Sequence, residues 1–216
     1  MHTLTRQTPS KYFRAATCVL SLLLPTATQS SSVSAQPPAA YCGLSLSVPE
    51  GLTLRLEAEA PPPLCVLRGE GGTPTPYINS LSSLPWNRLD QLRVDGQPLR
   101  TIGFFRLRVG SVTYGGRPSY EDGQRGFAQH VLGRPKQSRG VLADGSKRLR
   151  VRTELRVKWL KPRESGVEEE VEETIVCLDE ATWDGKRVAV FNWCASKDGV
   201  ALGRVAAMLE SLSLAP

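Results

Sequence analysis

The stretch KRLRVRTELRVKW, residues 147–159, does most to decide the fold. From Leu149 to Trp159 every second residue is apolar or small, and from Arg148 to Lys158 the residues between them are charged. A period of two places the two sets on opposite faces of a β-strand. The stretch therefore predicts a strand with one buried face and one solvated face.

An acid-rich strand at residues 167–178 is expected next, after a turn at residues 161–166. If Lys158 lies opposite Glu170, then Arg156 lies opposite Glu172, and a basic strand face meets an acidic one. Each such cross-strand pair contributes about 0.2–1 kcal/mol.

A third strand is predicted beyond the turn sequence WDGK, residues 183–186, because Asp-Gly between apolar runs is typical of a hairpin. The chain then carries an apolar stripe at helical spacing, which Ser196 or Asp198 can cap. The stripe is formed by Leu202, Val205, Leu209 and Leu212. The predicted fold class is α+β: an antiparallel sheet, with a C-terminal three-stranded meander, packed by a C-terminal helix. Residues 36–216 are expected to form this single domain, with a Gly- and Pro-rich irregular excursion at 115–146.

The first 35 residues are typical of an export signal. Lys11 and Arg14 precede an apolar run at 15–24, and VSA at 33–35 is a small-residue cleavage site. The run is shorter than the roughly 20 residues that span a bilayer. The sequence thus predicts an exported, periplasmic or extracellular protein with no integral membrane segment in its mature chain.

The mature chain is only mildly basic. All 21 acidic residues follow residue 35, whereas three of the 27 Lys and Arg precede it, so the net charge beyond residue 35 is 24 − 21 = +3. This balance does not indicate a nucleic-acid partner.

Four cysteines remain after Cys18, which lies in the expected signal. An even number in an oxidising compartment indicates disulfides. Folding the chain about residues 185 and 186 places Cys177 opposite Cys194, within disulfide reach. Cys42 and Cys65 are then left for each other.

Three segments together resemble the PsbP/Mog1/DcrB-like domains: SLSVPEGLTLR at 45–55, DGKRVAVFNW at 184–193 and MLESLSL at 208–214. Leu52 stands where that family pattern usually has Trp. A similar layout occurs in periplasmic immunity proteins of bacterial secretion-system effectors. The resemblance covers the two ends of the mature chain, roughly residues 41–57 and 174–214, and leaves its middle uncovered. It implies a binding role without fixing which one.

Catalytic groups are scarce in the mature sequence. His130 is its single histidine, no G-x-S-x-G motif occurs, and no zinc-ligand spacing is present. The glutamate run at 168–173 fits neither a calcium loop nor a defined acid/base pair, and a solvated strand face explains it. The sequence predicts no cofactor and no metal.

The leading hypothesis is therefore a non-enzymatic binding protein of the cell envelope, whose partner is another envelope or secreted protein. An effector-neutralising immunity protein is its specific form. The candidate binding residues flank or lie within the 115–146 excursion: Tyr114, Tyr120, Glu121, Asp122 and His130.

Two alternatives stay open. A hydrolase would use carboxylates such as Glu121, Asp122 and Asp144, although acids before glycine are more typical of turns. A lipid- or polyanion-binding envelope component would use the basic stretch at 147–158 with Trp159. The neighbouring acidic strand is expected to neutralise most of that stretch.

We expect Cys177–Cys194 and Cys42–Cys65 to be oxidised in the mature protein. The first closes a loop of about 16 intervening residues, worth roughly 3 kcal/mol in the chain-entropy estimate. Reduction should therefore lower the melting temperature markedly. Non-reducing peptide mapping checks the pairing, and four free thiols or a Cys42–Cys177 crosslink would contradict it.

Overall fold

The computed structural model describes most of the chain beyond residue 38. The described residues are 39–41, 43–56, 65–70, 79–86, 93–94, 97–98, 100–108, 110–122, 126–164, 166–197 and 199–214. The predicted signal at 1–35 and Cys42 of the predicted Cys42–Cys65 disulfide fall outside them, so that disulfide stays a prediction. Within the described part of the chain, no helix is long and apolar enough to cross a membrane.

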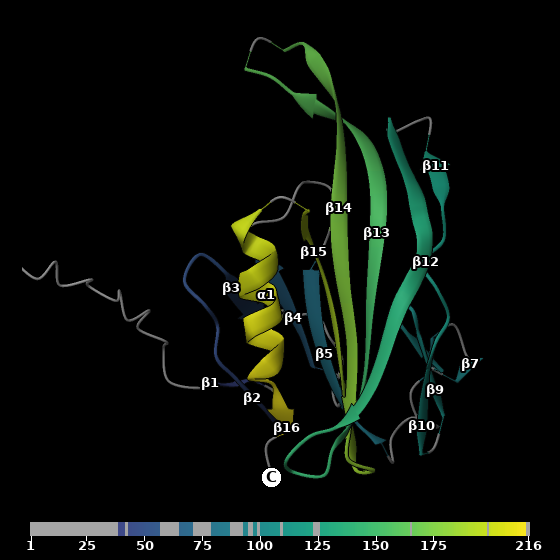
Figure 1. Ribbon diagram of the computed structural model, residues 1–216, viewed down its shortest axis with the longest axis vertical. Helices are drawn as coiled ribbons and strands as arrows, with labels where there is room; N and C mark the ends of the chain where they lie inside the picture. The colour runs from purple at the N-terminus through teal and green to yellow at the C-terminus, as the bar shows by residue number, and fades with distance from the viewer. Residues whose placement is uncertain are drawn as a thin grey trace, which may run out of the picture. The chain divides into compact units, whose positions relative to one another are not determined.

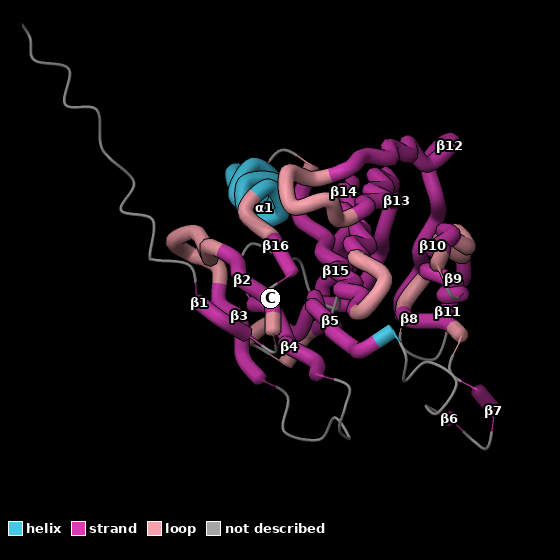
Figure 2. Tube along the Cα trace, turned by 90° about the horizontal axis from the view of Figure 1, so that it is seen from below, coloured by secondary structure: helices cyan, strands magenta, loops and turns pink. Residues whose placement is uncertain are grey.

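The main element is an eight-stranded antiparallel sheet, whose long strands run side by side in Figure 1 and which is seen to be curled in Figure 2. Its order across the sheet is β11-β12-β13-β14-β15-β5-β4-β3. The strands are β11 (Tyr120–Asp122), β12 (Phe127–Val141), β13 (Lys147–Pro162), β14 (Glu168–Trp183), β15 (Arg187–Ser196), β5 (Asn79–Pro85), β4 (Cys65–Glu70) and β3 (Thr53–Leu56).

Smaller elements accompany this sheet. One three-stranded sheet joins β1 (Ala39–Tyr41), β2 (Leu44–Leu46) and β16 (Ser213–Leu214), and another joins β8 (Thr101–Ile102), β9 (Phe105–Arg108) and β10 (Ser111–Tyr114). The pair β6 (Arg93–Val94) and β7 (Gln97–Pro98) forms a two-stranded sheet. The helix of the described chain is α1 (Val200–Glu210), with Gly199 as its N-cap and no side-chain capping bond.

The predicted fold class, α+β with a three-stranded meander under a helix, is wrong. The structure is mostly β, and β13, β14 and β15 are only the middle of a much wider sheet. The sequence-based expectation missed strands on both sides of that middle: β5 on one side and β12 on the other.

β5 occupies residues for which the sequence allows a short helix. Leu81 and Leu84, three apart, fit a helical face, but the structure pairs β5 with β15 on one side and β4 on the other. Both faces of β5 are consequently buried, including the small polar residues Ser82 and Ser83. Tertiary pairing here overrides the local pattern.

β12 lies in the segment expected to be an irregular excursion at 115–146. Its 15 residues pair with β13 in two runs, separated by a register shift between Leu132 and Lys136. Gly133, at φ 70°, and Pro135 lie inside this bulge. A bulge accommodates residues that a regular ladder excludes, so these turn-like residues bend the strand without ending it.

The pairing of β13 with β14 differs from the expected register by two residues. Lys158 lies opposite Glu172 and Arg156 opposite Thr174. A shift of two keeps every side chain on the face predicted for it. The expected alternation is confirmed: odd-numbered residues from Leu149 to Trp159 are buried.

Each face of the sheet covers its own apolar cluster. On one face, α1 places Val205, Met208 and Leu209 against strand residues such as Phe191 and Trp193, whose rings stack at 5.7 Å. The opposite face packs against the β8–β10 sheet through Phe105, Leu107 and Val112 (Figure 2). β15 and the second part of β14 are therefore buried on both faces, whereas β13 keeps one partly exposed face.

Replacing Phe191, which is 1% exposed, with Ala should lower the free energy of unfolding by about 3–5 kcal/mol, because it leaves a cavity under α1. Val200→Ala is the matched control: Val200 is 75% exposed, and its change should stay within about 0.5 kcal/mol. Urea denaturation measures both. Equal stability of the two variants would contradict the packing described for this face.

Candidate functional site

The turn between β13 and β14 ends a two-stranded projection, which we call the acidic hairpin (residues 158–173). β12 pairs with β13 no further than Lys158, and β15 pairs with β14 only from Ile175 onward. In the described chain, Trp159–Pro162 and Glu168–Val171 therefore pair only with each other. Figure 1 shows this hairpin extending beyond its neighbours at the top of the sheet.

The acidic hairpin has an excess of negative charge. It contains three basic residues and six glutamates, which gives a net charge of −3. The basic residues are Lys158, Lys161 and Arg163, and the glutamates are Glu164, Glu168, Glu169, Glu170, Glu172 and Glu173. Lys158 binds Glu172 at 2.8 Å, and Arg163 binds Glu169 at 2.7 Å. The hydrogen bond from Lys158 lowers the pKa of Glu172.

Two glutamates near the turn, Glu164 and Glu168, are exposed and make no ion pair within the described residues. Two apolar side chains lie among these charges: Val167 is 64% exposed and Leu160 38%. The hairpin thus presents an acidic surface with apolar points.

The base of the acidic hairpin is packed. Trp159 is 8% exposed and clusters with Val171 and Phe127, on the face opposite α1. Tyr120, at 46% exposure, extends this packing, with its ring 5.3 Å from that of Phe127. The projection therefore begins from a fixed apolar base.

The structure brings four of the five predicted binding residues together on β11 and β12 beside this base and places the fifth, Tyr114, elsewhere. Tyr120 and Glu121 lie on β11, and His130 on β12 approaches Glu121 at 3.4 Å. His130 also lies opposite Arg156. Burial, followed by the charge of Asp122, which also lies on β11, raises the pKa of Tyr120.

Tyr114 is packed elsewhere. Its hydroxyl lies 3.3 Å from Thr153 Oγ1, and its ring is 5.6 Å from that of Phe105. Burial raises the pKa of this tyrosine. Asp144 is in the turn between β12 and β13, where its Oδ1 accepts a hydrogen bond from the Ser146 N–H at 2.9 Å, as a turn-forming aspartate does.

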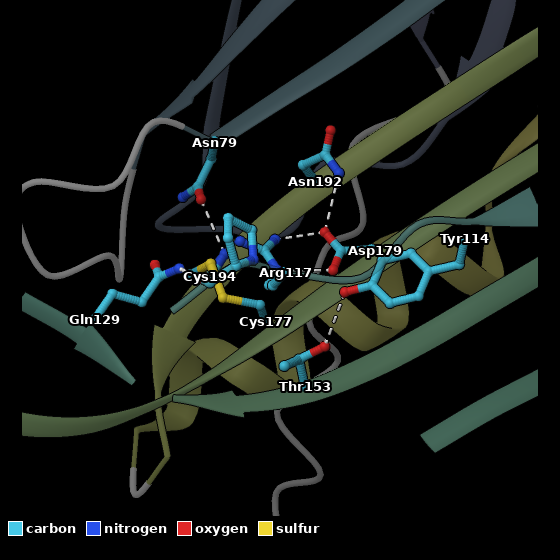
Figure 3. The surroundings of a disulfide bond; sticks show 10 residues. Asn79, Tyr114, Arg117, Gln129, Thr153, Cys177, Asp179, Asn192 and Cys194 are labelled. Carbon is cyan, nitrogen blue, oxygen red and sulfur yellow. Dashed lines mark hydrogen bonds and ion pairs between the residues drawn. A yellow bond between two sulfur atoms is a disulfide. The ribbon is translucent and has the colours of Figure 1, made fainter. Parts of the chain in front are cut away.

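A buried ion pair that the sequence analysis missed holds the segment leading to β11. Arg117 donates to both carboxylate oxygens of Asp179, at 2.9 and 2.5 Å, and the two side chains are 5% and 0% exposed. Asn192 donates a further hydrogen bond to Asp179 at 2.9 Å (Figure 3). The Phe104 ring lies 4.4 Å from the guanidinium carbon of Arg117.

Two more hydrogen bonds fasten the same segment to β12. Gln129 donates to the Pro118 carbonyl at 2.6 Å, and the Val131 N–H donates to Ser119 Oγ at 2.8 Å. The alternation of β14 could have indicated the Arg117–Asp179 ion pair, because Asp179 lies on the same strand face as the buried residues Cys177 and Ala181. An aspartate at such a position requires a partner.

The Cys177–Cys194 disulfide is confirmed. The two residues lie directly opposite each other with Cα atoms 4.0 Å apart, and the Cys194 N–H donates to Asn79 Oδ1 at 2.9 Å (Figure 3). The bond therefore links β14 to β15 beside the Arg117 ion pair, next to where the projection begins.

The helix side of the sheet carries a second charged network. Arg150 binds Glu180 at 2.6 Å and Glu210 of α1 at 2.5 Å. Burial raises the pKa of Glu180, whereas the hydrogen bond from Arg150 lowers the pKa of the exposed Glu210. This network joins the helix to β13.

Among the described residues, no group of three or more His, Cys, Asp or Glu side chains could hold a metal ion. No protein-family model matches the chain, and no curated protein matches it in sequence. What the site offers chemically is a pattern of charge on a rigid base, suited to recognition of an oppositely charged surface.

Asp179→Asn should destabilise the protein by about 3–5 kcal/mol, because it leaves the Arg117 guanidinium buried without a counter-charge. The double variant Arg117→Met with Asp179→Leu removes both charges and should regain most of that loss. Urea denaturation of the single and double variants gives the comparison. A single variant as stable as the exposed control Glu164→Gln would rule out this anchor.

Proposed function

We propose that this protein is an exported, non-enzymatic interaction protein of the cell envelope, and that the acidic hairpin contacts a partner protein. The supporting observation is the projection itself. Its two strands leave the sheet, pair only with each other within the described chain, and carry exposed glutamates that make no ion pair with a described residue. A surface with this much exposed charge attracts a partner of opposite charge over several ångströms.

The chemistry of the hairpin defines what the partner must present. Glu164 and Glu168 suit lysines or arginines, and the exposed Val167, next to Glu168 in the sequence, suits an apolar contact beside them. Interfaces commonly combine an apolar centre with a polar rim. The partner surface should thus be basic with an apolar hollow.

A projecting hairpin can enter a cleft more deeply than a flat sheet face can. In the specific form of the proposal, the partner is a secreted effector with a basic active-site cleft, and the hairpin blocks it. The packed base supports this form, because a preorganised element loses little conformational freedom on binding. Trp159, Phe127 and Tyr120 supply that base.

Reversing charge at the turn tests the proposal. The variant Glu164→Lys with Glu168→Lys should weaken partner retention by about tenfold or more, because like charges then meet at the interface. Pull-down from envelope extract, followed by affinity measurement with the retained protein, provides the readout. Thermal melting confirms that the variant is folded.

The opposite change on the same hairpin is the matched control. Lys161→Glu with Arg163→Glu makes the turn more acidic and should leave retention unchanged or strengthen it. Reproducible failure of the wild-type protein to retain any partner would count against the proposal. So would equal loss of retention in both variants, which would indicate a contact independent of charge.

A further inference from the structure

The opposite end of β13 carries a concentration of positive charge, which we call the basic hairpin (residues 134–152). It comprises the second part of β12, the turn and the first part of β13. Seven basic residues stand against one acidic residue, Asp144, for a net charge of +6. The basic residues are Arg134, Lys136, Arg139, Lys147, Arg148, Arg150 and Arg152.

The pairing of β13 with β14 keeps the glutamate run away from this charge. The sequence suggests that the acidic strand neutralises the basic one, but Glu168–Glu173 pair with residues 157–162. Arg148, Arg150 and Arg152 instead lie opposite Thr182, Glu180 and Leu178. The glutamate run therefore does not reach the basic hairpin.

Part of the basic hairpin is compensated within the protein. Arg148 and Arg150 bind Glu210, Arg150 binds Glu180, and Arg152 binds Glu154. The other four residues are exposed and make no ion pair within the described chain; they are Arg134, Lys136, Arg139 and Lys147. The free charge is concentrated on β12 and around the turn.

An apolar side chain stands at the tip of this charged surface. Val141 is the last residue of β12, is 72% exposed and lies between Arg139 and Lys147 in the sequence. An exposed apolar side chain flanked by cations gains free energy at an anionic membrane surface. The cations are attracted to the lipid headgroups, and the apolar side chain is buried at the boundary with the acyl chains. A soluble polyanion has no apolar region in which Val141 could be buried.

A strand from another protein is a less suitable occupant of this edge. Beyond Val131, β12 has no neighbour on its outer side in the described chain, but the bulge and Pro135 interrupt the free backbone groups there. Bulges, prolines and lysines are the devices by which sheet edges avoid strand addition.

We infer that the basic hairpin docks the protein on an anionic lipid surface, with Arg139 and Lys147, which share a face of the hairpin with Val141, at the headgroups and Val141 entering the interface. This goes beyond the proposed function, because it concerns another surface and another class of partner. Figure 1 places the turn from β12 to β13 at the bottom of the sheet and the acidic hairpin at the top. A protein docked in this way keeps the acidic hairpin away from the lipid.

The experiment measures sedimentation of the full chain with vesicles of phosphatidylcholine alone and of phosphatidylcholine mixed with phosphatidylglycerol. All variants keep the same residues 1–35, so any contribution of that segment is common to them. Binding should require the anionic lipid and fall as salt is raised. Arg139→Glu with Lys147→Glu should weaken it by about tenfold or more, since each basic residue near such a surface contributes about fivefold.

The matched control reverses two cations remote from the basic hairpin, Arg55→Glu on β3 and Arg204→Glu on α1, and should retain most of the binding. Val141→Ser should weaken binding to anionic vesicles without changing binding to soluble polyphosphate.

The inference is overturned if anionic vesicles are not bound, or if both double variants lose binding equally. Equal affinity for polyphosphate and vesicles, with no effect of Val141→Ser, would assign the surface to a soluble polyanion instead. None of these outcomes depends on the acidic hairpin, so the two proposals can fail separately.

Discussion

The pairing of β13 with β14 is the constraint on which the rest of the structure depends. These two strands, of 16 residues each, are paired from Lys147 opposite Trp183 to Pro162 opposite Glu168. Every other part of the main sheet is added to this ladder, β12 on one side and β15 on the other. Because side chains alternate strictly along it, the ladder fixes at once which residues face α1 and which face β8–β10. A slip of one residue would exchange the two faces and bury the arginines of β13.

The ladder also explains why a charged pair is found in the middle of an apolar layer. Asp179 lies on β14 between two buried clusters, one containing Ile175 and Cys177 and the other Ala181 and Trp183. Buried ion pairs of this kind add little net stability over a well-packed apolar replacement. What Arg117 and Asp179 supply is position: two parallel hydrogen bonds allow one placement of the segment that leads into β11. Tyr120 and Glu121 are placed at the base of the acidic hairpin as a result.

The sequence predicted those features that a single strand can encode, and it failed where pairing between distant segments decides. The alternation from Leu149 to Trp159 and the turn around Gly185 are local, so the buried face and the Cys177–Cys194 pair were predictable. β5 was not, because its two leucines fit a helix and only burial between β15 and β4 makes it a strand. β12 was hidden by Gly133 and Pro135, which the bulge accommodates. In the candidate site, the sequence picked out Tyr120, Glu121 and His130 but missed Arg117, whose partner is 62 residues away.

The pairing of β13 with β14 decides where charge gathers on the surface. Opposite charges on β13 and β14 attract each other in the expected register and in the observed one. Charge pairing alone therefore does not select one of these two registers. The turn between the two strands, closed by the hydrogen bond from the Arg163 N–H to the Val167 carbonyl at 3.0 Å, limits how far β14 can slide along β13. With the observed register, the glutamates gather at one end of the ladder and the uncompensated cations at the other. The β13–β14 ladder thus keeps the glutamates of one end apart from the cations of the other. The protein forgoes the electrostatic attraction that these charges would have side by side. A sheet that keeps such a separation presents two distinct charged surfaces at once, and a partner bound at one end leaves the other available.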